Sequence, residues 1–99
     1  MNFPFPAGSG RAQVLGAVEN ALMPAMQKFR PELVLVSAGF DSRVDDLLGR
    51  FTLTDEDFAD LTRRVLEMGN GRVVSILEGG YRLSGLASAA AAHVRVLLG

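Results

Sequence analysis

Two short apolar runs dominate the hydrophobic pattern of the chain. The first covers residues 33–36 (Leu-Val-Leu-Val) and the second residues 73–77 (Val-Val-Ser-Ile-Leu). Both are rich in β-branched residues and neither alternates apolar with polar positions, which is typical of short strands buried in a parallel sheet. Small residues follow each run, with Ser37-Ala38-Gly39 after the first and Gly79-Gly80 after the second. The pattern therefore predicts two parallel strands that each end in a tight turn.

Three amphipathic stretches flank and separate these strands. Residues 11–29 carry an apolar stripe at helical spacing, but Pro24 predicts a kink or a break with this proline in the first turn of a second helix. The second helix begins where Thr54 and Asp57 form a capping box, and it ends at a Gly-Asn-Gly turn near residue 70. The third helix covers about residues 84–98. The predicted order is helix, strand, helix, strand, helix.

This order predicts an α/β fold with three layers (α-β-α) around a small parallel sheet. A further short N-terminal strand is considered for residues 2–5, where phenylalanines alternate with other residues and the prolines would restrict it to an edge. The 99 residues are enough for one small domain.

Composition and charge exclude several classes of protein. At 48% apolar and 21% charged residues the chain is globular, and a net charge of −1 gives no basic surface for nucleic acid or an anionic membrane. The absence of cysteine excludes disulfides and thiolate metal sites. No apolar run approaches membrane-spanning length and no secretory signal is visible, so we expect no membrane partner and a cytoplasmic location.

The candidate chemistry lies just beyond the two strands. Open α/β sheets bind their ligands beyond the carboxyl ends of the strands, and here one turn presents Asp41 and the other Tyr81. We expect both side chains at the same edge of the sheet, facing a common hollow. Simpler interpretations are that Asp41 caps local amides and that Tyr81 is a packed residue with a satisfied hydroxyl. His93, the only histidine, is interpreted as a surface or packing residue.

The turn residues carry a resemblance to a known family. Ser37-Ala38-Gly39-Phe40-Asp41 with Asp46 five residues on, and then Leu77-Glu78-Gly79-Gly80-Tyr81, resembles the C-terminal part of the zinc-dependent histone deacetylase superfamily. The similarity is greatest to the class II and bacterial deacetylase-like amidohydrolases, which include acetylpolyamine and acetoin-utilisation proteins. Residues 2–10 (NFPFPAGSG) also resemble this family. Because the family domain is several times longer, residues 1–99 are interpreted as a single partial domain.

The resemblance implies roles for particular residues. Asp41 matches a zinc-binding aspartate, and Tyr81 matches the catalytic tyrosine that hydrogen-bonds the substrate carbonyl. Gly79 and Gly80 match the glycine loop that lines the substrate pocket, and Leu48 matches an apolar residue on the pocket wall. The family's other zinc ligands and its histidine pair match nothing in this sequence. Since a catalytic zinc needs three protein ligands, we expect zinc only in the complete domain, without tight binding by this chain alone.

Two functions of different classes follow. In the first, the chain is part of a zinc-dependent deacetylase-like amidohydrolase acting on acetyl-lysine or acetyl-amine substrates, inactive as an isolated piece. In the second, it is a non-catalytic α/β half-domain that forms a homodimer or complements a separate N-terminal segment, since no lysine or proline within the strands protects their edges. A flavodoxin-like binding domain is disfavoured because the sequence has no phosphate fingerprint and Glu78 would repel an anion.

Overall fold

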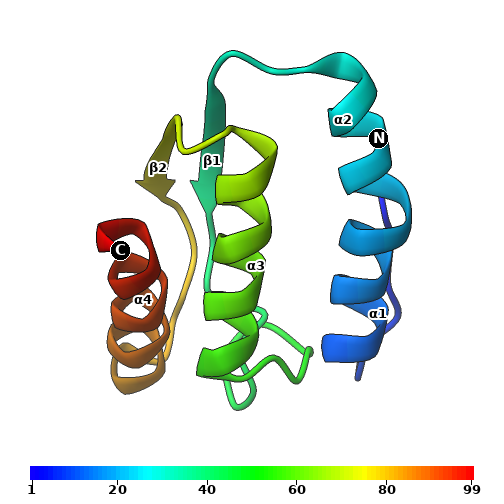
Figure 1. Cartoon of the computed structure of the whole chain (residues 1–99). Helices are drawn as coiled ribbons and strands as arrows, with labels where there is room; N and C mark the ends of the chain where they lie inside the picture. The colour runs from blue at the N-terminus through cyan, green and yellow to red at the C-terminus, as the bar shows by residue number, and fades with distance from the viewer.

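The computed structural model describes residues 1–99 and is built on a two-stranded parallel sheet (Figure 1). Strand β1 is Val34–Ala38 and strand β2 is Val73–Leu77, and the register pairs Ala38 with Leu77 at their ends. The ladder continues one step further, because Glu78 donates its N–H to Ala38 O (2.9 Å) and Phe40 donates to Gly79 O (2.8 Å). Both turns therefore leave the sheet at the same edge.

The first helical stretch is a continuous rod beside α3 (Figure 1). It consists of α1 (Arg11–Ala17), a π-helical segment (Val18–Leu22) and α2 (Met23–Phe29). Pro24 lies in the first turn of α2, as predicted. A proline ring clashes with the carbonyl four residues earlier, here that of Asn20, and the wider π turn relieves this clash. The interruption is thus a change of helix type.

Helix α3 (Asp55–Met68) begins at the predicted capping box. The Asp57 N–H donates to Thr54 Oγ1 at 3.3 Å, and the Thr54 N–H donates to an Asp57 carboxylate oxygen at 2.8 Å. Leu53 and Phe58, which flank the cap, are both buried in the core. The last helix, α4, is Leu83–Leu98 and packs against α3. These contacts confirm the predicted order of helices and strands.

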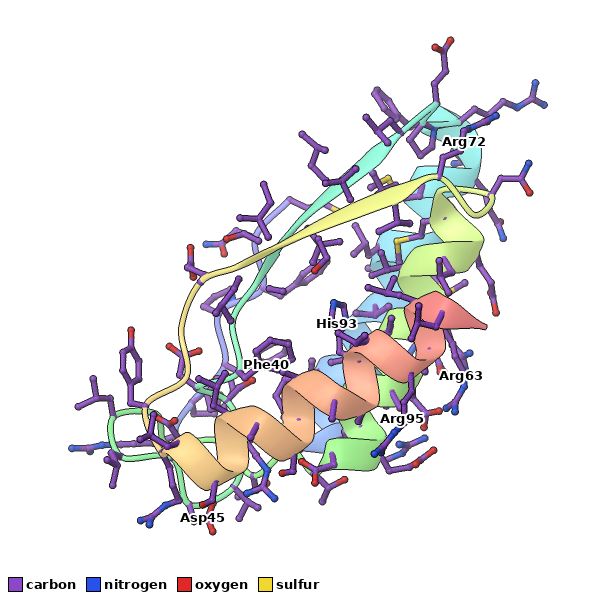
Figure 2. The ribbon with its side chains drawn as sticks, turned by 90° about the vertical axis from the view of Figure 1, so that its left-hand side faces the viewer. Phe40, Asp45, Arg63, Arg72, His93 and Arg95 are labelled. Carbon is purple, nitrogen blue, oxygen red and sulfur yellow. The ribbon has the colours of Figure 1, made fainter.

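All helices lie on one face of the sheet (Figure 2). Val36 and Ala38 of β1 face the helices, whereas Leu35 and Ile76 on the opposite face are 68% and 61% exposed. The core is consequently small, with 15 of 99 residues buried. Its buried cluster is Ala38, Phe40, Leu53, Phe58 and Ala89. The α/β class and the small parallel sheet are confirmed, but these residues supply no helical layer over the second face of the sheet.

The N-terminal segment forms no strand, so the strand considered for residues 2–5 is wrong. Pro4 removes one of the N–H donors that a ladder over residues 2–5 would use, and Pro6 follows directly after them. The segment instead lies against the loop before α3, where Gly8 donates its N–H to Arg50 O (2.7 Å) and Thr52 donates to Ser9 O (2.9 Å). The Phe5 and Phe51 rings pack edge to face, with their centroids 6.1 Å apart. No helix is both long and apolar enough to cross a membrane.

Candidate active site at the strand ends

Asp41 follows β1 with a carboxylate that has no partner. The preceding Phe40 is anchored in the core, and Asp41 itself is half-buried. Every other aspartate in the chain makes an ion pair or a hydrogen bond, whereas the Asp41 carboxylate makes neither. It therefore caps no local amide, and its oxygens are available to bind something else.

Glycines surround this carboxylate. A Cβ atom added to Gly79 would lie 2.7 Å from Oδ2 of Asp41, closer than Cβ atoms pack in proteins. A Cβ on Gly49 would overlap the Asp41 carbonyl oxygen. Gly79 at the end of β2 and Gly49 in the loop after β1 thus let the backbone close around Asp41. The structure therefore places the Asp41 carboxylate close to the backbone of Gly79.

Tyr81 follows a second glycine that the turn needs. Gly80 has φ of +137°, and a Cβ there would also lie 2.8 Å from Cδ1 of Leu86. The Tyr81 side chain is 46% exposed and its hydroxyl makes no hydrogen bond with the rest of the chain. The simpler interpretation of a packed tyrosine with a satisfied hydroxyl does not describe this residue.

Asp46 connects the two turns, a role that the sequence did not reveal. Its Oδ2 accepts the N–H groups of Leu48 and Gly49, each at 2.9 Å. Its Oδ1 accepts the N–H groups of Tyr81 (2.8 Å) and Arg82 (3.4 Å). Partial desolvation raises the pKa of Asp46, but the four backbone donors outweigh it and lower the pKa to about 2. The carboxylate is therefore ionised at neutral pH.

Arg43 holds the same loop to α3. Its Nε lies 2.7 Å from Oδ1 of Asp55 in the first turn of α3, and its Nη1 lies 3.0 Å from Oδ1 of Asp45. This guanidinium lowers the pKa of the Asp55 carboxyl. Of the acids at the start of α3, Asp57 thus serves in the predicted capping box and Asp55 as an ion-pair partner.

The hollow beside Asp41 is small. It measures about 180 Å³ and is lined by Asp41, Ser42, Gly49, Arg50 and Phe51. Leu48, Gly80 and Tyr81 do not line it, and the Leu48 side chain is 69% exposed. The strand ends bring the predicted site residues to one edge of the sheet, but this hollow is not shared by Asp41 and Tyr81.

The strand ends offer a metal ion a single free carboxylate, that of Asp41. No group of three or more His, Cys, Asp or Glu side chains in the chain could hold a metal ion. Glu78, the acid that follows β2, already accepts a hydrogen bond from Ser37 Oγ at 2.9 Å. A free carboxylate oxygen suits zinc, so the chemistry of Asp41 fits a single zinc ligand, and residues 1–99 offer no complete site.

His93 is part of a hydrogen-bond network that the sequence did not predict. Its ring is 8% exposed, with Nδ1 2.6 Å from Thr62 Oγ1 and Nε2 2.8 Å from Ser75 Oγ. Thr62 Oγ1 donates its proton to Phe58 O, so it accepts from Nδ1–H, and Nε2 accepts from Ser75. Burial lowers the pKa of His93. The ring packs against Phe40, just before Asp41 (Figure 2), so the packing interpretation of His93 is correct.

Comparison with known proteins decides the family. Residues 1–97 match the histone deacetylase domain. The chain belongs to the histone deacetylase family. This deacetylase-family chain is 44% identical over 100 residues to the mouse (Mus musculus) polyamine deacetylase HDAC10, a match that covers 100% of the chain and 15% of that protein. It is 40% identical over 100 residues to histone deacetylase 6 of Caenorhabditis elegans, covering 98% of the chain and 10% of that protein.

Solved structures of the family agree with the fold. The histone deacetylase Clr3 superimposes with a TM-score of 0.94 at 36% identity, over 99% of this chain and 17% of that one. The HD domain of HDA15 superimposes with a TM-score of 0.95 at 32% identity, over 99% of this chain and 28% of that one. The deacetylase-family chain thus spans between 10% and 28% of the length of these proteins. Deacetylases of this family are generally zinc-dependent.

Proposed function

We propose that this chain supplies one side of a zinc-dependent active site that hydrolyses acetyl-amide bonds. The observation that carries the proposal is Asp41: alone among the aspartates it has no partner, and it lies at the carboxyl end of β1 against Gly79. Asp41 would be one protein ligand of the zinc, with the remaining ligands from outside residues 1–99. When bound, zinc acts as a Lewis acid toward the amide carbonyl.

The other residues of the site would orient the substrate and stabilise charge. The free hydroxyl of Tyr81 can donate a hydrogen bond to the oxyanion that develops on the substrate carbonyl. Gly79 and Gly80 carry no side chains, so a narrow acyl-lysine or acyl-amine chain can approach the backbone between the two strand ends. Leu48 offers an exposed apolar side chain on the loop after β1, suited to the methylene groups of such a substrate.

The substrate class we propose is an acetylated amine, either acetyl-lysine or an acetylated small molecule. The relatives are named as a polyamine deacetylase and as histone deacetylases, and both groups of substrate carry an acetyl amide on a flexible alkyl amine. The isolated 99 residues, with one zinc ligand, would be inactive. The cytoplasmic location stays a prediction from the sequence.

Substitution of Tyr81 tests this function. In a zinc-loaded complete domain that contains residues 1–99, we expect Tyr81→Phe to lower kcat by about 10²–10³, the cost of losing one oxyanion donor. The zinc content should not change, because the phenol is not a ligand. Leu83→Ala, an exposed side chain two positions further on, is the matched control and should keep full activity. An unchanged kcat for Tyr81→Phe would remove this residue from the mechanism.

A second candidate function is a self-associating half-domain, favoured by the bare face of the sheet. Leu33, Leu35, Val74 and Ile76 are all exposed there. We propose a second copy of the chain as the occupant, since an apolar face is complementary to itself across a two-fold axis and a net charge of −1 opposes the contact little.

A further inference from the structure

The backbone of Tyr81 is hydrogen-bonded to a single side chain. The amide of Tyr81 donates to Oδ1 of Asp46 at 2.8 Å, across 35 positions of sequence. No other hydrogen bond is made by Tyr81, through either its backbone or its hydroxyl. With nearly half of its side chain exposed, this residue also has little packing to hold it. The bond to Asp46 is therefore the one hydrogen bond that holds the Tyr81 backbone.

The same carboxylate is itself held firmly. Its Oδ2 accepts the amides of Leu48 and Gly49, which closes the loop after β1 around the Asp46 side chain. Arg43 ties this loop to α3 through Asp55. A second link runs parallel to the first, because Arg82 donates its Nε–H to Asp45 O at 2.6 Å. The turn after β2 is thus fastened to a loop that is fastened to the core.

We propose that Asp46 is a positioning residue that holds the Tyr81 backbone so that the phenol hydroxyl meets the substrate carbonyl beside Asp41. This inference rests on the proposed function of Tyr81. Asp46 would touch neither substrate nor metal. Its effect is geometric: a small rotation of the Tyr81 backbone moves the distant hydroxyl by a larger distance, and a misplacement of about 1 Å costs on the order of 10²-fold in rate.

The restraint can be seen in the 99-residue chain itself. We expect Asp46→Asn to speed amide hydrogen exchange at Tyr81 and Arg82 by about tenfold or more. Asparagine has one acceptor oxygen where the carboxylate has two, and its NH₂ group cannot accept a hydrogen bond. Asp45→Asn is the matched control: its carboxylate is mostly exposed and pairs only with Arg43, so exchange at Tyr81 should not change. Equal exchange at Tyr81 in Asp46→Asn and the parent chain would overturn the proposal.

A double-mutant cycle distinguishes positioning from a general structural role. In the zinc-loaded complete domain, Asp46→Asn should lower kcat by about 10–100-fold and leave KM within about threefold, since a group used mainly in the transition state is displaced. In a Tyr81→Phe background the same change should cost little, because the hydroxyl that it positions is already gone. If the two losses multiply instead, Asp46 acts independently of Tyr81 and the proposal is wrong.

Two further outcomes keep the inference separate from the function on which it rests. If Tyr81→Phe has full activity, the proposed function of Tyr81 fails. If Tyr81→Phe is impaired while Asp46→Asn is fully active, only the positioning role fails. Should Asp46→Asn not fold, replacing the Tyr81 amide by an ester in a semisynthetic protein removes the one N–H and keeps the loop bonds of Asp46. This ester should lower kcat by a similar factor, and full activity would refute the proposal.

Discussion

Replacement of His93 by phenylalanine isolates the hydrogen bonds that this ring makes behind Phe40, the residue before Asp41. The phenylalanine keeps an aromatic ring against Phe40, whose centroid lies 5.6 Å from that of His93. It removes the bonds to Thr62 and Ser75. Thr62 keeps its bond to Phe58 O, and the half-buried Ser75 hydroxyl can turn to water, so neither is left as a buried orphan.

The expected cost follows from these contacts. Each lost hydrogen bond is worth about 0.5–1.5 kcal/mol net, so His93→Phe should lower the free energy of unfolding by roughly 1–3 kcal/mol. At a urea dependence of about 1–2 kcal/mol per molar, the unfolding midpoint should fall by on the order of 1 M. Urea titration followed by circular dichroism measures both. Arg95→Ala, an exposed side chain with no ion pair, is the control on the same helix and should stay within about 0.5 kcal/mol.

The same pair of proteins gives a test by pH. Burial lowers the pKa of His93 below its ordinary value of 6.5, so the folded chain binds a proton less readily than the unfolded chain does. The stability that comes from neutral His93 is fully present above pH 6.5 and is lost as the pH falls below that value toward the folded pKa. Because the chain has one histidine, His93→Phe should remove the loss of stability between pH 7.5 and pH 5.5. Equal stability of His93→Phe and the parent, with the same pH dependence, would refute the assigned network.

Two other predictions concern the isolated chain. Calorimetric titration with zinc should show no one-to-one site of submicromolar affinity, because a catalytic site needs three protein ligands and this chain offers Asp41 alone; such a site within one chain would contradict the ligand assignment. Light scattering at tens of micromolar should report at least a dimer, since the sheet has free edges and a bare apolar face, and Ile76→Lys on that face should shift the chain toward monomer. A well-folded, strictly monomeric parent chain would exclude self-association.

The sequence predicted those features that depend on neighbours along the chain. The capping box of Thr54 and Asp57, the position of Pro24 and the glycine turns all follow from local chemistry, and the structure has them. The two strands were also predicted, and their pairing in parallel places Asp41 beside Gly79.

Contacts between distant positions could not be predicted in this way. Nothing in the spacing of Asp46 and Tyr81 indicates that one accepts the amide of the other, and Asp46 was noticed only as part of the family pattern. Thr62, Ser75 and His93 come from three elements, so their network depends on how those elements pack. The apolar sequences of the two strands predicted burial of both faces of the sheet, yet one face is exposed. An apolar sequence indicates that a strand is suited to burial, but it does not indicate which segment covers the strand.

Zinc content after substitution of Asp41 tests the central claim most directly. Asp41→Ala should remove most of the zinc from a complete domain that contains residues 1–99, because the proposed function makes Asp41 one of three protein ligands. Glu32→Ala is the matched control, because the Glu32 carboxylate also makes no ion pair or side-chain hydrogen bond. Glu32 precedes β1, so it lies at the amino ends of the strands, away from Asp41. The account predicts that Glu32→Ala keeps stoichiometric zinc while Asp41→Ala loses it. Equal zinc content in the two variants would contradict the assignment of Asp41 as a metal ligand.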